Sequence, residues 1–474
     1  MAVGAMILLA ALALRVRCAT GELWLDEVWS LSDAVGAGSV HEILTLRNVD
    51  NNHLLNSLWL HALGDGRSSL AYRSLSVITG MLAIVFAAWY ARRWGAAAML
   101  VTLALLGLSH PLVHYSSEAR GYAPALCFAF AALLALDRFT ARNDVRFAAI
   151  FGVCIVLGTL SHLLFLQAYA ALALWSLLCA LQSERPGEAL FRTLSRAHLL
   201  PAIFLVYLYV FQLHYLTIAG ASPREPTEAI LHTFALFAGL PRTTDWGVAA
   251  MLALGGLAVA GIAVIARAKH DLVVLFALWI GIVPAVLLAI ARPTFLFERY
   301  FLICGALALV AIARALAGLI ERRGPWRVAG GALLALFIAA NLWQIGGLWR
   351  LDRGHYRDLI AYIVAHDDAD RIAVTGDQDF RHPLMLRHYA RPPFTDATIQ
   401  YSGFFVLPRE GAAWNILHMR APWAEPLPRI SDRHGNHYEL AAAYRSDILS
   451  GYHLALYRRA GGPDPAGQTP RSPP

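Results

Sequence analysis

The run FLICGALALVAIARALAGLI, residues 301–320, holds one charged side chain, Arg314, among twenty residues. A helix needs about 20 predominantly apolar residues to cross the hydrocarbon core of a bilayer. Runs of this kind recur along the 474-residue chain, which is 58% hydrophobic and only 15% charged. Soluble domains carry about 25% charged residues. The sequence therefore predicts an all-α polytopic membrane bundle.

Eleven membrane-spanning helices are expected, over residues 1–17, 70–90, 96–113, 122–137, 147–161, 163–182, 199–216, 247–266, 271–290, 300–320 and 328–345. The apolar run 147–182 is too long for one helix. We divide it at Ser161 and His162, the strongly polar pair near its middle. A single long tilted helix is the alternative for this run.

Basic residues are unequally distributed between the two sets of loops. One set holds fourteen: Arg92, Arg93, Arg138, Arg142, Arg146, Arg185, Arg192, Arg196, Arg267, Lys269, Arg314, Arg322, Arg323 and Arg327. The opposite short loops hold five: Arg120, Arg224, Arg242, Arg292 and Arg299. Basic loops face the cytoplasm. We expect a bacterial inner-membrane protein with a cytoplasmic N-terminus and a periplasmic C-terminus. The net charge of +7 thus reflects membrane loops and does not indicate a nucleic-acid partner.

The chain divides into three expected parts. Residues 1–345 form the transmembrane domain, whose first periplasmic loop, 18–69, carries amphipathic helices; apolar residues recur at helical spacing over 54–63. Residues 346–460 mix helical and strand-like patterns and predict a small periplasmic α/β domain with scattered, solvated acids and histidines. Residues 461–474 are rich in Pro and Gly and are expected to be disordered.

The expected outer face collects unusual polar groups. An acidic pair, Asp26 and Glu27, follows the first apolar run, and Arg120, His162 and Arg299 stand at the ends of later runs. Ionisable groups at membrane depth are costly and usually functional. An arginine fork suits phosphate oxygens, and a carboxylate can deprotonate a hydroxyl. The set fits attack on a sugar attached to a phosphate. Helix capping and interfacial anchoring are the structural alternatives.

The segments LWLDEVWS, residues 23–30, and SSEARGYAPAL, residues 116–126, resemble those of multi-span glycosyltransferases that use polyprenyl-phosphate sugars. The most similar group is the protein O-mannosyltransferase and aminoarabinose-transferase superfamily. The resemblance implies a bundle of about eleven to thirteen spans, with Asp26 as the general base. Glu27 would support the site, or bind Arg120 or a metal. One departure is NNHLLN, residues 51–56, where many relatives carry His-Pro-Pro-Leu.

The site expected from the residues and the resemblance has three groups. Asp26 and Glu27 are catalytic; the donor phosphate contacts Arg120, His162, Arg299 and Tyr300; and the supporting residues are Asp50, His53, Glu118 and Tyr122. This interpretation of the site includes no certain cofactor. A divalent metal, held by Asp26 or Glu27, remains open.

The favoured function is a hexosyl- or pentosyltransferase, inverting at the anomeric carbon. It would move a sugar from a polyprenyl-phosphate donor to a glycan, lipid or protein hydroxyl on the periplasmic face. A transporter or flippase for a lipid-linked saccharide is the first alternative, although related halves are not visible in the sequence. A structural subunit of an envelope complex is the second alternative, and it would not need the acidic pair.

Overall fold

The structure is a computed structural model that describes residues 2–217, 225–268, 270–293, 295–419, 423–447 and 449–460. Its contacts divide the chain into two compact units. Unit 1 comprises residues 1–20 and 29–349, and unit 2 comprises residues 21–28 and 350–474. The expected disordered tail, 461–474, lies outside the described residues. Unit 2 thus includes residues 21–28, a piece of the expected first outer loop that carries the acidic pair.

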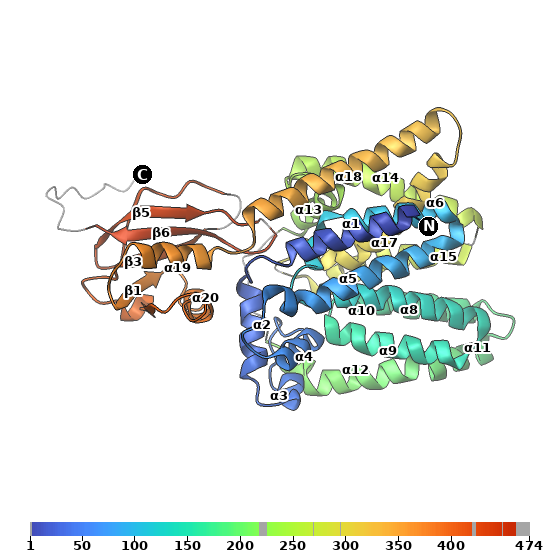
Figure 1. Ribbon diagram of the computed structural model, residues 1–474. Helices are drawn as coiled ribbons and strands as arrows, with labels where there is room; N and C mark the ends of the chain where they lie inside the picture. The colour runs from blue at the N-terminus through green and yellow to red at the C-terminus, as the bar shows by residue number, and fades with distance from the viewer. Residues whose placement is uncertain are drawn as a thin grey trace. The chain divides into compact units, whose positions relative to one another are not determined.

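Unit 1 is helical, and its long helices run roughly parallel to one another (Figure 1). The α-helices, with α2 shared between the units, are α1 (Ala2–Cys18), α2 (Leu25–Gly36), α3 (Val40–Thr45), α4 (Leu54–Leu63), α5 (Ser69–Ala91), α6 (Ala96–Leu108), α7 (His110–Tyr115), α8 (Tyr122–Arg142), α9 (Val145–Ser161), α10 (Phe165–Leu181), α11 (Pro186–Thr193), α12 (Leu199–Phe211), α13 (Pro226–Ala238), α14 (Thr244–Ala268), α15 (His270–Ala277), α16 (Val283–Ala291), α17 (Leu302–Ile320) and α18 (Pro325–Leu351). Short turns η1 (Arg92–Trp94), η2 (Leu194–His198), η3 (Leu213–Tyr215), η4 (Leu278–Ile282) and η5 (Glu298–Phe301) complete the set.

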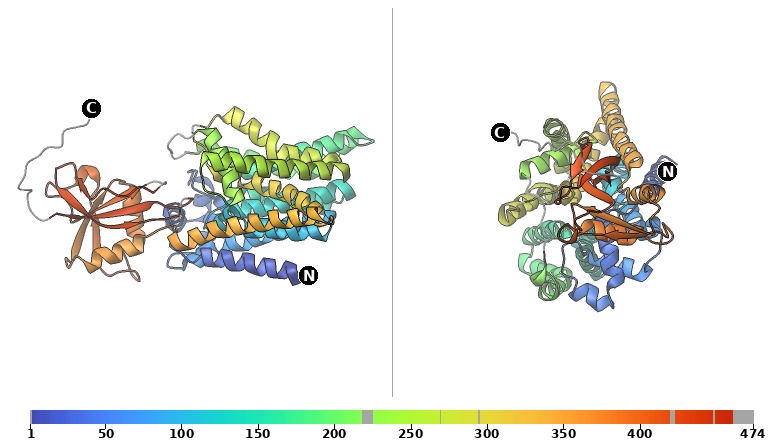
Figure 2. Two further views of the ribbon diagram at one scale, coloured as in Figure 1. Left: turned by 90° about the horizontal axis from the view of Figure 1, so that it is seen from above. Right: turned by 90° about the vertical axis from the view of Figure 1, so that its left-hand side faces the viewer.

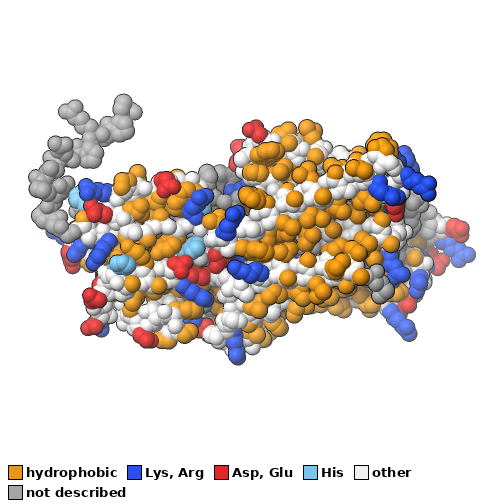
Figure 3. Space-filling model, turned by 45° about the horizontal axis from the view of Figure 1, so that its top comes forward, with side chains coloured by type: hydrophobic (Ala, Val, Ile, Leu, Met, Phe, Trp, Pro, Cys, Tyr) orange, Lys and Arg blue, Asp and Glu red, His pale blue; other side chains and the backbone are white. Residues whose placement is uncertain are grey.

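Each of the eleven expected runs is mostly helical over its described residues. Within the described residues, seven helical stretches are long and apolar enough to cross a membrane, so the count of eleven crossings stays a prediction. The division of run 147–182 is confirmed, because α9 ends at Ser161 and α10 begins at Phe165. Orange apolar side chains cover most of the helical face in Figure 3, as expected for a lipid-facing surface.

Two local expectations were wrong. The run 96–113 is not one helix, because α6 ends at Leu108 and Ser109 is extended before α7. Pro111 lies near the start of α7, and a proline cannot donate the backbone hydrogen bond that would continue α6. Residues 226–238, expected as loop, form α13, which begins with Pro226 and ends at Gly239 in a left-handed conformation. Its thirteen residues are too few to span a bilayer.

Polar side chains join helices inside unit 1. Asn341 of α18 accepts a hydrogen bond from the His110 backbone N–H at 2.7 Å. Its amide nitrogen donates to the carbonyls of Phe337 (3.0 Å) and Phe237 (3.4 Å). Asn341 is fully buried and so connects α7, α13 and α18. Buried amides of this kind link helices where apolar contacts alone give little specificity.

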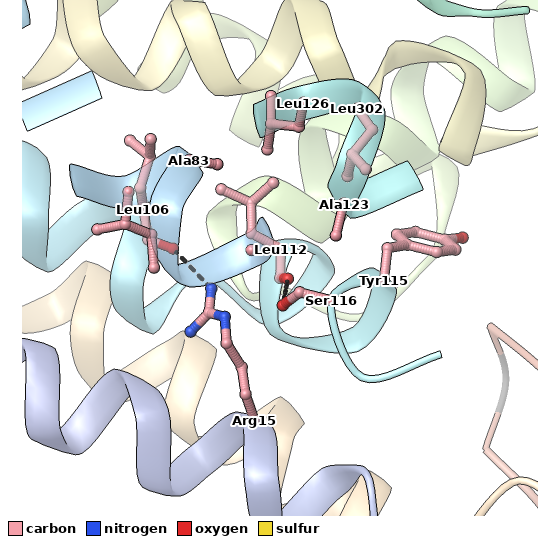
Figure 4. A pocket seen from close by; sticks show the side chains of 11 residues that line it. Arg15, Ala83, Leu106, Leu112, Tyr115, Ser116, Ala123, Leu126 and Leu302 are labelled. Carbon is pink, nitrogen blue, oxygen red and sulfur yellow. Dashed lines mark hydrogen bonds between the residues drawn. The ribbon is translucent and has the colours of Figure 1, made fainter. Parts of the chain in front are cut away.

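Arg15 near the end of α1 has a structural role. Its guanidinium donates to the carbonyls of Ala11 (3.0 Å) and Gly107 (2.8 Å) and, more weakly, to that of Leu106 (3.4 Å). Figure 4 shows the side chain reaching from α1 to Leu106 beside a small apolar cavity. Gly107 and Leu106 lie in the last turn of α6, where carbonyls lack helical partners. A buried cation there satisfies them and opposes the negative end of the helix dipole.

Unit 2 contains a six-stranded sheet, seen in two orientations in Figure 2. Its elements after residue 351 are α19 (Tyr356–Ala365), β1 (Arg371–Gly376), α20 (Arg381–Tyr389), β2 (Thr398–Tyr401), η6 (Phe404–Val406), β3 (Trp414–Met419), β4 (Arg429–Ser431), β5 (His437–Tyr444) and β6 (His453–Arg459). The strand order is β2-β1-β3-β6-β5-β4. The pairs of β1 with β2 and β3 are parallel, and the remaining pairs are antiparallel. The α/β character expected from the sequence is therefore confirmed.

Candidate functional site

Three rings from three distant segments meet in unit 1. His53 precedes α4, Tyr122 begins α8, and His162 follows α9. The ring centroids of His53 and His162 are 4.4 Å apart, and those of Tyr122 and His162 are 4.6 Å apart. Tyr122 also lies 5.0 Å from the ring of Tyr115. Three residues of the expected site, His53, Tyr122 and His162, are thus brought together; we call these three the ring cluster.

Arg120 lies beside the ring cluster, and the charge of Arg299 also acts on its two histidines. The guanidinium carbon of Arg120 is 5.5 Å from the ring centroid of Tyr122. The pKa of the buried His53 is well below its usual value because of burial and then the charges of His162, Arg120 and Arg299. The charges of Arg120 and Arg299 also act on His162. Positive charge from two segments therefore converges on two imidazoles, and His53 is held neutral.

The turn that carries Arg120 is fixed by its neighbours. Asn56 of α4 donates to the carbonyl of Ala119 at 2.7 Å, and Ser76 of α5 donates to the carbonyl of Arg120 at 2.9 Å. Gly121 lies so close to α9 that a Cβ there would overlap the carbonyl oxygen of Ser161. The small residue allows the turn to approach the end of α9. This close approach brings Arg120 and Tyr122 next to His162.

The hydrogen bonds of the two histidines define which nitrogen can donate. The backbone N–H of Gly121 donates to His53 Nδ1 at 2.9 Å, and that of Leu164 donates to His162 Nδ1 at 3.1 Å. A neutral imidazole that accepts through Nδ1 carries its proton on Nε2. Both side chains therefore offer an Nε2–H donor. Two such donors with two guanidinium groups form a set that suits an anion.

Tyr300 and Asp50 complete the neighbourhood of the ring cluster. The backbone carbonyl of Tyr300 accepts a weak hydrogen bond from Gln167 of α10 at 3.4 Å, which ties η5 to that helix. The charges of Arg299, Arg120 and the exposed Asp50 act on the Tyr300 phenol. Capping of α4 by Asp50 or Asn52, the structural alternative to a role in the site, is not seen, because His53 occupies the N-cap position. Asn52 instead donates to the Arg47 carbonyl at 2.7 Å.

Two buried acids of unit 1 are engaged by cationic or titratable partners. Glu118 Oε1 lies 3.0 Å from His114 Nε2, and both side chains are fully buried. Glu298, next to Arg299, lies 3.4 Å from Arg242 Nη1 and 3.6 Å from His232 Nδ1. The sequence did not single out His114, His232 or Arg242 as site candidates. The glutamate of the adjacent pair Glu298 and Arg299 was the one available indication, because a buried carboxylate requires a cationic partner nearby.

Asp26 and Glu27 belong to unit 2 and lie in the first turn of α2. Glu27 is fully buried, and its Oε2 accepts the backbone N–H of Trp24 at 3.1 Å. A glutamate at the third helical position that binds back to the N-cap N–H is half of a capping box. Glu27 thus performs the capping role that the sequence offered as the structural alternative. Asp26 is only half-buried.

Within unit 2, Glu22 and Leu23, which come just before Asp26, form hydrogen bonds with the sheet domain. The two carboxylate oxygens of Glu22 accept the backbone N–H groups of Tyr356 and Arg357, each at 3.0 Å. The Glu22 N–H donates to Asp352 at 3.1 Å, and the Tyr389 hydroxyl donates to the carbonyl of Leu23 at 2.9 Å. Residues 22 and 23 are therefore held by α19, by α20 and by Asp352. No sequence pattern indicates this attachment, because it joins residues more than 300 positions apart.

No protein-family model and no curated protein matches the chain. Among solved structures, the crystal structure of ArnT from Cupriavidus metallidurans in the apo state matches with a TM-score of 0.51 and 12% identity, over 95% of this chain and 97% of that chain. The crystal structure of ArnT from the same organism bound to undecaprenyl phosphate gives a TM-score of 0.49 at 12% identity, over 97% and 99%. Nearly the whole chain therefore has the fold of apo ArnT, as the resemblance of its motifs predicts.

Proposed function

We propose that the chain is a multi-pass glycosyltransferase of the bacterial inner membrane that uses a polyprenyl-phosphate sugar. The fold shared with ArnT supports this proposal, and so do the two motifs that resemble the protein O-mannosyltransferase and aminoarabinose-transferase superfamily. The observation that carries it is that the charges of Arg120 and Arg299 act on His53 and His162, each of which offers an Nε2–H donor. A phosphate needs charge and several hydrogen-bond donors together.

In this proposal Arg120 and Arg299 bind the phosphate of the donor, with His162 and Tyr300 beside them. His53 and Tyr122 support His162 by ring contact. Asp50 and the buried Glu118–His114 pair hold the surrounding segments. Since His53 is held neutral, it adds a hydrogen bond without repelling the arginines.

Asp26 is the general base of the proposed reaction. It takes the proton of the acceptor hydroxyl as that oxygen forms a bond to the anomeric carbon. The bond from this carbon to the phosphate oxygen breaks, and the polyprenyl phosphate leaves with the electron pair. Attack opposite to the leaving group inverts the anomeric centre. Glu27 contributes indirectly, because its bond to Trp24 N–H fixes the start of the helix that carries Asp26.

The proposed topology has eleven spans, a cytoplasmic N-terminus and chemistry on the periplasmic face. The loop charges support this orientation, with fourteen basic residues on one side and five on the other. A donor whose lipid stays in the bilayer keeps its reactive carbon near the headgroup layer. The acceptor in this proposal is a hydroxyl of a glycan, lipid or protein.

The test is sugar transfer by detergent-solubilised protein from purified polyprenyl-phosphate sugars. Arg120→Lys and Arg299→Lys keep the charge but lose the fork. Each should lower kcat/KM by about 10-fold or more, since a hydrogen bond to a charged group contributes about 1.5–3 kcal/mol. Arg142→Lys, at the exposed other end of α8, is the control and should keep wild-type kinetics.

Two outcomes would contradict the proposal. Unchanged kinetics in both site variants would assign the arginines to membrane anchoring. Movement of a lipid-linked saccharide across vesicle membranes, without transfer to any acceptor, would favour the transporter alternative.

A further inference from the structure

A compact group of ionisable side chains lies in unit 2, away from the residues assigned to transfer. Asp377 directly follows β1, His382 lies on α20, and His418 lies on β3. One ligand-type atom from each residue lies within 4.8 Å of the others. Asp377 Oδ1 is 2.9 Å from His382 Nε2 and accepts the His418 backbone N–H at 3.0 Å. The parallel pairing of β1 with β3 brings Asp377 and His418 together.

Tyr356 of α19 connects the opposite sides of the two imidazoles. Its hydroxyl lies 2.9 Å from His382 Nδ1 and 3.0 Å from His418 Nε2. The remaining ring nitrogen, His418 Nδ1, is buried and has no hydrogen-bond partner among the described residues. Buried polar atoms are rarely left without a partner. Hydrogen bonding among the described residues of unit 2 therefore does not account for the burial of this nitrogen.

We propose that Asp377, His382 and His418 bind a divalent transition-metal ion of the zinc type. Two imidazole nitrogens and one carboxylate oxygen are a donor set that Zn²⁺ accepts, with a further position for water. His382 would bind through Nε2 and His418 through Nδ1. The Tyr356 hydroxyl would then form a hydrogen bond with the ring nitrogen of each histidine that does not bind the metal. Metal-binding histidines usually have an outer hydrogen-bond partner at that nitrogen. The sequence indicated Asp26 or Glu27 instead as the ligand of any metal.

Binding requires a small rearrangement. The two imidazole planes are 13° from parallel with centroids 4.4 Å apart, so their lone pairs cannot point at one ion without a tilt. A tilt of the His418 ring breaks no hydrogen bond at Nδ1, which has none among the described residues, while Nε2 stays near the Tyr356 hydroxyl. The Asp377 side chain is 31% exposed, which gives an ion a route from solvent. A small cavity beside His418 is lined by Trp24, Leu25, Arg353, Tyr356 and Tyr452.

The experiment measures metal binding by the full-length protein, purified without a polyhistidine tag, stripped with chelator and dialysed against Zn²⁺ or Co²⁺. We expect one ion per chain by elemental analysis. The Co²⁺ form should show visible absorption bands of tetrahedral or five-coordinate geometry. Asp377→Asn and His418→Gln should lose this ion. Tyr356→Phe should weaken the affinity by about 10–100-fold, as loss of an outer hydrogen-bond partner typically does.

His366→Gln is the matched control, because His366 is an exposed histidine of the same unit outside the cluster. It should bind metal as the wild type does. Thermal unfolding of the metal-free proteins separates lost ligands from lost folding, and Asp377→Asn serves if His418→Gln does not fold. A wild-type chain that retains no ion would overturn the proposal, as would equal binding by Asp377→Asn and the wild type.

Discussion

Replacement of Glu22 by Gln tests the attachment of the segment that carries Asp26. Both oxygens of Glu22 accept backbone N–H groups at the start of α19, and the side chain is buried. Burial raises the pKa of Glu22 to about 7, and the charge of Asp352 adds to this increase. The hydrogen bond from the Arg357 N–H and the charges of Arg357 and His355 oppose it.

The sign of the pH effect follows from this increase. The folded chain holds the Glu22 proton more tightly than the unfolded chain does, so the extra stability is complete below the ordinary pKa of 4.5. It is lost as the pH rises through about 7. The difference between these pKa values corresponds to about 3 kcal/mol of unfolding free energy. Gln does not titrate, so Glu22→Gln should remove this dependence.

The assay is thermal unfolding of the wild type and of Glu22→Gln in detergent at pH 5 and pH 8. Comparing the two proteins cancels groups that both contain, including Asp352 and His355. About 2.5 kcal/mol of this difference falls between pH 5 and pH 8, so the wild type should lose roughly 5–10 °C more in Tm than the variant, at about 2–4 °C per kcal/mol. Asp368→Asn, an exposed carboxylate after α19, should behave as the wild type. Identical pH profiles for the wild type and Glu22→Gln would show that the protonation of Glu22 is not linked to folding.

Three further changes address unit 1. Gly121→Ala should lower both Tm and transfer, because a Cβ would overlap the Ser161 carbonyl; an unchanged Tm would show that the turn can move. Arg15→Met should lower Tm, since each buried carbonyl left unsatisfied costs about 1–3 kcal/mol; wild-type stability would mean that water replaces the guanidinium. Reporter fusions after Arg93 and after Leu348 should read cytoplasmic and periplasmic respectively, and two fusions reading the same side would reject the orientation.

The apolar runs predicted the positions of the long helices well. Membrane helices are specified by local composition, so the apolar runs, with the run 147–182 divided at Ser161 and His162, were sufficient to place eleven helical regions. The predictions of secondary structure were wrong where a single residue, or the short length of an element, determines the conformation. Pro111 ends the helical run at Ser109, and α13 is amphipathic and short. In unit 2, β2 and β4 have four and three residues, which is too few for an alternating pattern to be visible.

Site residues were identifiable one at a time, but their grouping was not. Arg120, His162 and Arg299 stood out because charged and polar groups are rare in apolar sequence. Their convergence depends on the close approach at Gly121 and on the accepting nitrogens of His53 and His162. No spacing in the sequence encodes those contacts, because the segments come from different helices.

The acidic pair shows the same limit. Asp26 and Glu27 are adjacent and chemically alike, so sequence alone could not divide their roles. The structure shows Glu27 buried and bonded to Trp24, whereas Asp26 is half-buried. The grouping of Asp377, His382 and His418 in unit 2 was not predicted, because His418 lies next to Asp377 only through the pairing of β1 with β3.

Sugar transfer by Asp26→Asn from a purified polyprenyl-phosphate sugar, with Tm recorded in parallel, tests whether Asp26 is the base. Asn keeps the size and the helix-capping ability of Asp but cannot accept the proton. We expect a loss of 10²-fold or more in kcat at near wild-type Tm, the scale typical of removing a general base. Asp33→Asn, on the same helix, should retain full transfer. Near-normal transfer by Asp26→Asn would contradict the assignment of Asp26 as the base.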